Sequence, residues 1–195
     1  QYKAEESLAY EAYLSGKNSN DIPNVVNCQS EQSTCFEVAP FEGKAKDRVA
    51  IPRVKMPELK PEERIQSIYN EVNQGLTFEQ AITEAHRCLD CKNPTCVKGC
   101  PVNINIPGFI KQLEIGNVLS AAEIIQQSST LPAVCGRVCP QEKQCEAQCI
   151  HLKMGHDPVA IGYLERFVAD NAYKLSQSAL VLDNISKAST RGKIA

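Results

Sequence analysis

Apolar side chains recur at helical spacing in several stretches of the chain. Between residues 65 and 72, four of them fall at i, i+3, i+4 and i+7, and Gly75 follows as a stop signal. Thr77 and Gln80 then form a capping-box pattern, which predicts a helix that runs into Cys88. The two patterns predict two successive helices.

Three further helices are predicted in the second half of the chain. Pro107 sits at the first turn of one, and Asn117 can cap the next. The Asp157-Pro158 pair opens a last helix that runs to about Tyr173. The ALVL run at 179–182 is the only strand candidate. We therefore predict an all-α fold, in which loops carry cysteines between helices.

The N-terminal part has a different character. Residues 1–16 are rich in helix formers and end at Gly16, which predicts a helix. Residues 17–60 are polar and are predicted to form an irregular arm. The expected division is an N-terminal helix and arm at 1–47, a compact helical domain at 48–173, and a linker at 174–195.

Charge and composition narrow the function classes. The net charge of −2 points neither to nucleic acid nor to a membrane surface, and no apolar run approaches the ~20 residues of a membrane span. The chain has ten cysteines, and eight of them lie between Cys88 and Cys149. Disulfide-rich secreted proteins spread their cysteines as loop staples. The clustering instead predicts metal ligation in a reducing compartment, the cytoplasm.

The eight clustered cysteines form two groups of four. The first group is Cys88, Cys91, Cys96 and Cys100, followed by Pro101, and the second is Cys135, Cys139, Cys145 and Cys149, with Pro140 after its second member. The first group is the C-x2-C-x2-C-x3-C-P pattern of bacterial two-cluster ferredoxins with a wider middle gap. This spacing predicts [4Fe–4S] clusters.

Zinc is the alternative that spacing leaves open, because two groups of four thiolates can also form two tetrahedral zinc sites. Such a chain would be a zinc-stabilised, non-redox interaction module. Zinc sites usually pair two C-x2-C knuckles, however, and only Cys88 and Cys91 form one here. Cys28 and Cys35, in the polar arm, are predicted to be free thiols.

Three segments carry a resemblance to a known family. They are CLDCKNPTCVKGCPVNINIPGFI, LPAVCGRVCPQEKQCEAQC and PVAIGYLERFVAD. Together they resemble the N-terminal iron–sulfur domain of the small subunit (beta chain) of NADPH-dependent glutamate synthase. The same domain opens dihydropyrimidine dehydrogenase and the large subunit of NADH-dependent ferredoxin:NADP oxidoreductase. The resemblance covers about 48–173 and implies an alpha-helical ferredoxin-like fold with two [4Fe–4S] clusters.

The resemblance also implies which residues hold each cluster. The first cluster would be bound by Cys88, Cys91, Cys96 and Cys149, and the second by Cys100, Cys139, Cys145 and a non-cysteine ligand from the last helix. That ligand is a glutamine in dihydropyrimidine dehydrogenase. The matching position of this sequence is Glu165.

The helical pattern places Glu165 in an apolar stripe, whereas Arg166 and Asp170 are expected to point away. The stripe consists of Ile161, Leu164, Glu165, Val168 and Ala172. A carboxylate there is costly unless it is paired or binds a metal. Two simpler interpretations remain, in which Glu165 reaches solvent or pairs with Arg137. Spacing alone also offers Cys135 as a rival ligand.

The functional hypothesis is an electron-transfer domain of an NAD(P)H-dependent flavoprotein oxidoreductase. The relatives place a flavin domain next, beginning with a strand and a Gly-rich phosphate loop. This chain ends at RGKIA, which looks like the start of that strand, and has no GxG. We expect FAD and NAD(P)H to bind a domain present in cis or in trans, a second redox subunit as a further partner, and no catalysis by this chain alone.

Overall fold

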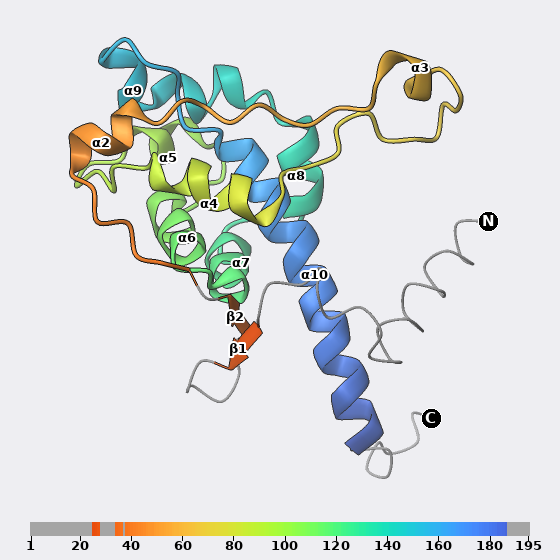
Figure 1. Ribbon diagram of the computed structural model, residues 1–195. Helices are drawn as coiled ribbons and strands as arrows, with labels where there is room; N and C mark the ends of the chain where they lie inside the picture. Colours follow the sequence, from red (N-terminus) through yellow and green to blue (C-terminus); the bar gives the residue numbers. More distant parts are fainter. Residues whose placement is uncertain (1–24, 28–33, 37, 187–195) are drawn as a thin grey trace.

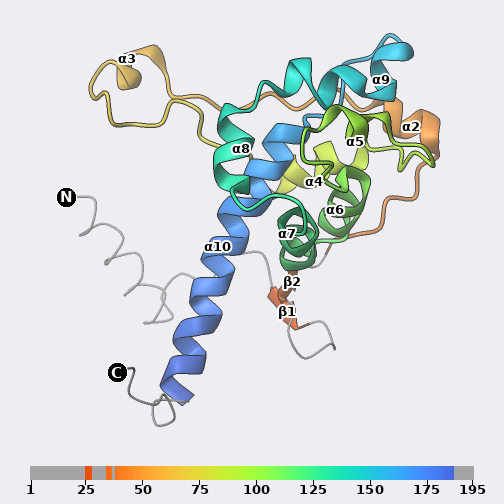
Figure 2. The same ribbon diagram turned by 180° about the vertical axis from the view of Figure 1, so that it is seen from behind.

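The computed structural model describes residues 25–27, 34–36 and 38–186, and Figures 1 and 2 show it from opposite sides. Most of the helices surround one apolar core, and α10 extends well beyond the others (Figure 1). The elements are β1 (Val25–Asn27), β2 (Thr34–Phe36), α2 (Ala45–Ala50), α3 (Pro61–Arg64), α4 (Phe78–His86), α5 (Thr95–Gly99), α6 (Ile106–Glu114), α7 (Val118–Gln126), α8 (Pro132–Val138), the 3-10 helices η1 (Gln141–Lys143) and η2 (Glu146–Gln148), α9 (Ile150–Lys153) and α10 (Ile161–Ser186).

The predicted all-α class is confirmed, with one small addition. β1 and β2 pair antiparallel as a short hairpin, with Val26 opposite Cys35. Neither strand showed a clear alternating pattern, because three residues are too few for a period of two to stand out. The predicted helix at 1–16 and Cys28 lie outside the described residues.

The core forms where α4, α6, α7 and α10 meet. Phe109, Ile110 and Leu113 of α6 are fully buried, together with Ile125 of α7 and Leu164 of α10. α6 and α7 lie side by side, and α10 packs against α7 and α8 (Figure 1). This apolar contact fixes the position of α10, which carries Glu165.

Three helix starts confirm the sequence predictions. The Thr77 hydroxyl accepts a hydrogen bond from the Gln80 backbone N–H, and the Gln80 side chain accepts one from the Thr77 N–H, so the capping box of α4 is complete. Pro107 lies in the first turn of α6. Asn117 caps α7 by accepting a hydrogen bond from the Ser120 N–H at 3.2 Å.

The last helix is longer than predicted. It begins at Ile161, three residues after Pro158, and continues past Tyr173 to Ser186. The run at 179–182, which was the one strand candidate of the sequence, lies inside α10, in agreement with the all-α prediction. After its second residue the helix contains no glycine or proline, so nothing in the chain interrupts it.

The helix predicted from Pro61 to Gly75 forms only in its first turn, as α3. α3 ends at Arg64, and the following residues form turns and loop. Ile65, Ile68 and Tyr69 are 83%, 92% and 91% exposed. A helix formed by this stretch would find no apolar surface to pack on among the described residues. An amphipathic helix of this length needs such packing to be stable.

This loop closes on itself at its base and projects from the body (Figure 1). The Leu59 N–H donates to the Val72 carbonyl at 2.9 Å, and the Gln74 N–H donates to the Pro57 carbonyl at 2.8 Å. The Arg64 side chain also bonds the Leu59 carbonyl. These backbone bonds take the place of the predicted helical ones.

Residues 38–57, which we call the strap, lie along the helical body and contain α2 (Figure 1). The sequence predicted an irregular arm here, and α2 is the one helix within the strap. The predicted domain boundary between residues 47 and 48 falls inside α2. Arg48 and Arg53 project from the strap and bond the body, at contacts described below.

Candidate metal centre

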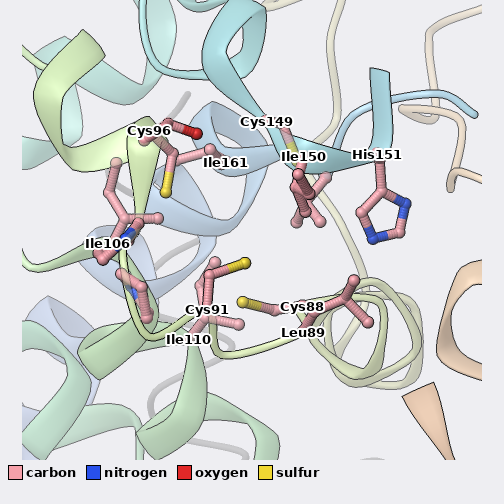
Figure 3. A pocket seen from close by; sticks show the side chains of 14 residues that line it. Cys88, Leu89, Cys91, Cys96, Ile106, Ile110, Cys149, Ile150, His151 and Ile161 are labelled. Atoms are coloured by element: carbon pink, nitrogen blue, oxygen red, sulfur yellow. The ribbon is translucent and has the colours of Figure 1, made fainter. Parts of the chain in front are cut away.

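In space the thiols are divided differently than in sequence, and from here on the first group means Cys88, Cys91, Cys96 and Cys149, which come from four short segments and line one cavity. Cys88 follows α4, Cys91 lies in the next loop, Cys96 is in α5, and Cys149 caps the N-terminus of α9. All four line the same cavity, and Figure 3 shows the sulfur atoms of Cys88, Cys91 and Cys96 facing the space between them. The structure thus brings Cys149 to three cysteines more than fifty residues earlier in the sequence.

The walls of this cavity are apolar. Ile106 and Ile110 of α6 line it, together with Ile150 and Ile161 (Figure 3). His151 also lines it and is fully buried, with its Nε2 3.0 Å from the Arg87 carbonyl oxygen. The space between the sulfur atoms is therefore lined mainly by apolar side chains.

Burial and mutual repulsion disfavour thiolates in this group. Burial, reinforced by the neighbouring Cys91 and Cys149, raises the pKa of the Cys88 thiol to about 11. Burial and the nearby Cys88 and Cys149 raise the pKa of Cys96 to about 12. Four thiolates would be stable together only with a compensating positive charge, which a bound metal supplies.

From here on the second group means Cys100, Cys139 and Cys145, which lie at the ends of three short elements. Cys100 caps the C-terminus of α5, Cys139 caps that of α8, and Cys145 precedes η2. Burial raises the pKa of Cys139 to about 11, with contributions from Cys135, Glu165 and Cys100. Burial raises that of Cys145 to about 12, with contributions that include Cys100 and Glu165. The three thiols and Glu165 are therefore neighbours.

Glu165 is a buried carboxylate without a partner. Its residue is 6% exposed, and its Oε1 has no hydrogen-bond partner among the described residues. Burial raises the pKa of the carboxyl group to about 7. The two simpler interpretations of the sequence fail, because Glu165 does not reach solvent and Arg137 is bonded to Glu71 and Asp170 instead.

Arg166 and Asp170 have polar partners outside the apolar stripe, but neither is fully exposed. Arg166 is 5% exposed, bonds the Asn73 carbonyl and forms an ion pair with Glu71. Asp170 is half-buried and paired with Arg137 and Arg166. The projecting loop carries Asn73 and Glu71, so this side of α10 is covered by a segment that helical periodicity cannot place.

Cys135 stays close to the second group. It is half-buried, contacts Cys139, and accepts a weak hydrogen bond from the Ser129 hydroxyl at 3.9 Å. The Gln141 side chain bonds its backbone carbonyl. Both candidates for the fourth ligand, Cys135 and Glu165, are thus neighbours of Cys139.

Comparison with known proteins assigns a family to this arrangement. Residues 64–177, more than half of the chain, match the family described as dihydropyrimidine dehydrogenase domain II, 4Fe-4S cluster.

The chain belongs to this 4Fe–4S domain family.

Curated relatives extend the match. The chain is 40% identical over 119 residues to the NADPH glutamate synthase small chain of Halomonas elongata, covering 61% of this chain and 25% of that protein. It is 43% identical over 108 residues to the same subunit of Escherichia coli, covering 55% and 22%. It is 37% identical over 131 residues to the NAD-dependent dihydropyrimidine dehydrogenase subunit PreT of Salmonella typhimurium, covering 67% and 30%. The chain spans only about a quarter of the length of these relatives.

The number and type of donors in this domain fit the cofactor of its family, a [4Fe–4S] cluster. A [4Fe–4S] cluster takes four ligands, and the first group offers four thiols around one cavity. No three His, Cys, Asp or Glu side chains within 38–175 converge closely enough to hold a single metal ion. A zinc ion needs its thiolates within about 2.3 Å of one point, whereas a cubane binds each thiolate at a separate corner. The matching family is described by a [4Fe–4S] cluster, and four thiols around one cavity agree with the ligand number of that cofactor.

Buried ion pairs beside the thiols were missed by the sequence reasoning. Glu84 and Arg87 of the 4Fe–4S domain are almost completely buried and pair at 2.6 Å. Glu84 also accepts the Ala160 N–H at the start of α10, and Arg87 donates to the Asp157 and Pro158 carbonyls. The only available signal was that Glu84 lies on the apolar face of α4, three residues before an arginine. This pairing joins α4 to the helix that carries Glu165.

Two glycines allow the elements that carry cysteines to approach closely. A Cβ on Gly136 would lie 2.6 Å from the Arg166 backbone nitrogen, so α8 packs directly on the backbone of α10. A Cβ on Gly99 would lie 2.6 Å from the Gln144 carbonyl oxygen.

Among the described helices, none is long and apolar enough to cross a membrane.

Proposed function

We propose that the chain binds two [4Fe–4S] clusters and is the electron-transfer domain of an NAD(P)H-dependent flavoprotein oxidoreductase of the glutamate synthase small-subunit type. The observation that carries the proposal is that four thiols line one cavity of a domain that belongs to a 4Fe–4S family, and the neighbouring Cys100, Cys139, Cys145 and Glu165 support a second site. Each set has the number of ligands that one cubane needs.

In this proposal Cys88, Cys91, Cys96 and Cys149 hold the first cluster. Support comes from the cavity that all four line and from the raised thiol pKa values, which a bound cluster would relieve. The apolar walls formed by α6 would keep water from the cluster, and low solvent exposure is one of the properties that set its reduction potential.

Cys100, Cys139, Cys145 and Glu165 would hold the second cluster. The support is that Glu165 is buried next to these thiols with an oxygen that lacks a partner. Coordination to iron would satisfy that oxygen and remove the cost of burying the carboxylate. When bound, the clusters would accept and release single electrons, and the residues of this chain hold and shield them.

Electron transfer needs a donor and an acceptor, which we place outside this chain. The relatives include an NADPH glutamate synthase small chain and an NAD-dependent dihydropyrimidine dehydrogenase subunit, both much longer than the match. We infer a flavin domain that binds FAD and NAD(P)H, in cis or in trans, and a second redox subunit. The clustering of eight cysteines within 88–149, which suits metal ligation rather than disulfides, is the reason for proposing a reducing compartment such as the cytoplasm.

The test is the metal content of anaerobically reconstituted protein. We expect about eight iron atoms and a similar amount of acid-labile sulfide per chain. Stoichiometric zinc without sulfide would instead establish the zinc-stabilised module. A second measurement checks the partner assignment: because this chain has no Gly-rich phosphate loop, calorimetry should detect no tight FAD binding and NADPH should not be oxidised.

A further inference from the structure

The strap contacts the body beside both groups of thiols, through one arginine at each. The match to the family model begins at residue 64, after the strap, whereas the resemblance noted in the sequence begins at about residue 48 and so includes Arg48 and Arg53. Nothing in the cysteine spacing or in the family match gives these residues a role. Two side chains of the strap nevertheless contact the cysteine segments: Arg48 bonds the backbone of Cys88, and Arg53 bonds Glu146, which follows Cys145.

Arg48 lies at the first group. Its Nη1 donates to the His86 carbonyl at 2.8 Å and to the Cys88 carbonyl at 3.3 Å, and its Nη2 donates to Glu114 at 2.6 Å. The guanidinium lies 4.5 Å from the centre of the Phe41 ring. The Arg48 and Glu114 side chains are only 14% and 7% exposed. Arg48 therefore holds the backbone at the end of α4 and at Cys88, the first cysteine of the group.

Arg53 lies at the second group and acts through Glu146. Its Nη2 donates to Glu146 at 2.8 Å, and its Nη1 donates to the Pro158 carbonyl at 2.8 Å. Glu146 directly follows Cys145 and also accepts a hydrogen bond from the Gly162 N–H in the first turn of α10. Arg53 thus joins a cysteine loop to the start of the helix that carries Glu165.

We propose that Arg48 and Arg53 are positioning residues, each for one cluster, and that their charges raise the reduction potential of the cluster they adjoin. This inference rests on the proposed function. Reduction adds one negative charge to a cluster, and a fixed cation nearby stabilises that charge. The strap is accordingly part of the cluster-binding domain.

The two arginines differ in how much their loss would cost. Without Arg48, Glu114 keeps Lys111 as a partner at 2.8 Å. Without Arg53, no other ion-pair partner for Glu146 exists among the described residues, and an unpaired buried carboxylate is strongly unfavourable. Arg48→Gln is therefore the variant that should fold readily, and it decides the proposal even if Arg53→Gln does not fold.

The experiment compares reconstituted holoprotein of the full chain in wild type, Arg48→Gln, Arg48→Lys and Arg53→Gln. Arg64→Gln is the matched control, because it removes the same charge from the projecting loop, where Arg64 bonds Glu58 and the Leu59 carbonyl. Cysteines are alkylated in the presence of an iron chelator without oxygen, and mass spectrometry measures the labelling rate of each cysteine. Redox titrations followed by electron paramagnetic resonance measure the two midpoint potentials.

Arg48→Gln should label the first group about tenfold faster than wild type and leave the second group unchanged, since a buried ion pair is broken beside one group only. One midpoint potential should fall and the other should stay. Arg48→Lys keeps the charge but loses the forked hydrogen bonds, so it should retain the potential while labelling faster. Arg53→Gln should reverse the pattern between the groups.

Equal labelling of both groups in each variant, or rates no different from those of Arg64→Gln, would overturn the proposal, as would unchanged potentials in Arg48→Gln. The two levels of inference fail separately. If wild-type protein holds no acid-labile sulfide, the proposed function fails and the strap proposal fails with it. If sulfide is present and the group-specific pattern is absent, only the role of the strap is wrong.

Discussion

The two groups of thiols differ in their surroundings. The first contains four cysteines around a cavity walled by isoleucines and backed by α6. The second contains three cysteines beside two acidic residues, Glu146 and Glu165, with Cys135 also in contact. One set is uniform and enclosed by apolar side chains, whereas the other is mixed and has one more candidate ligand than a cubane needs.

Because of this difference, the ligands of the first group can be recognised by residue type, whereas the fourth ligand of the second group cannot. A uniform set is recognised by residue type once four cysteines are found together. In a mixed set the fourth ligand depends on which side chains the fold turns inward, because both a thiolate and a carboxylate can bind iron. The predictions below test whether the two groups really differ in this way.

Removing the iron should have the largest effect. In the second group, Cys139 and Cys145 lie next to η1 and η2, two helices of only three residues each. By contrast, α4 and α6, which border the first group, contribute side chains to the apolar core. We expect amide exchange in 139–145 to accelerate roughly 100-fold or more in iron-free protein, the equivalent of about 3 kcal/mol. The acceleration in α6 and α7 should be much smaller. Hydrogen exchange with mass spectrometry checks this, and equal protection with and without iron would show that the loops pack unaided.

Replacing the candidate ligands should separate Glu165 from Cys135. Glu165→Ala should retain about four of about eight iron atoms, because the first group is complete without it. Cys135→Ser should retain all of them, since a half-buried cysteine that is not a ligand contributes only packing, which serine nearly preserves. Iron and sulfide analysis of matched reconstitutions measures both.

Glu165→Gln is the control for this pair, because an amide oxygen can still bind iron, and its loss should be milder. The opposite pattern, in which Cys135→Ser halves the iron and Glu165→Ala leaves it intact, would make the second group all-cysteine. The contrast between the two groups would then disappear.

Gly136→Ala should loosen the second group only. The added methyl carbon would lie 2.6 Å from the Arg166 backbone nitrogen and must push α8 away from α10, which separates Cys139 from Glu165. We expect a loss of about 1–3 kcal/mol in stability and weaker retention of half of the iron. Gly155→Ala is the control, because no atom lies within 4 Å of its added carbon and only its φ of +77° is strained. Denaturation curves and iron retention during chelation should separate the two variants.

A smaller effect concerns pH in iron-free protein. Burial raises the pKa of Glu165 from 4.5 to about 7, so between these values the folded state holds a proton that the unfolded chain has released. The contribution of this group is complete below pH 4.5 and is lost as the pH rises through 7. Glu165→Gln should remove this loss, on the order of 1 kcal/mol in an open site that can relax. Urea denaturation of both proteins from pH 5 to 8 measures it, and parallel curves would mean that Glu165 is not buried without iron.

Capping residues correctly predicted the start of α4 and of α7, because a cap depends only on neighbouring residues. Thr77 and Asn117 cap their helices because their side chains reach N–H groups three residues away, a geometry that needs no distant partner. The apolar spacing at Ile65 and Ile68 was equally regular and yet formed no helix. Periodicity can predict a helix only where a surface exists to receive it, and no short stretch of sequence specifies that surface.

The sequence by itself determined the chemistry of the site: eight cysteines in two spaced groups, and a carboxylate in the apolar stripe of the last helix. Only the tertiary structure decided how they combine, because Cys149 joins a set that begins at Cys88 through the path of the whole chain between them. It also decided that Glu165 is buried without a partner while Arg137 pairs elsewhere. The reason is physical: residue type fixes what a side chain can bind, but burial and neighbours depend on packing between segments that are distant in sequence.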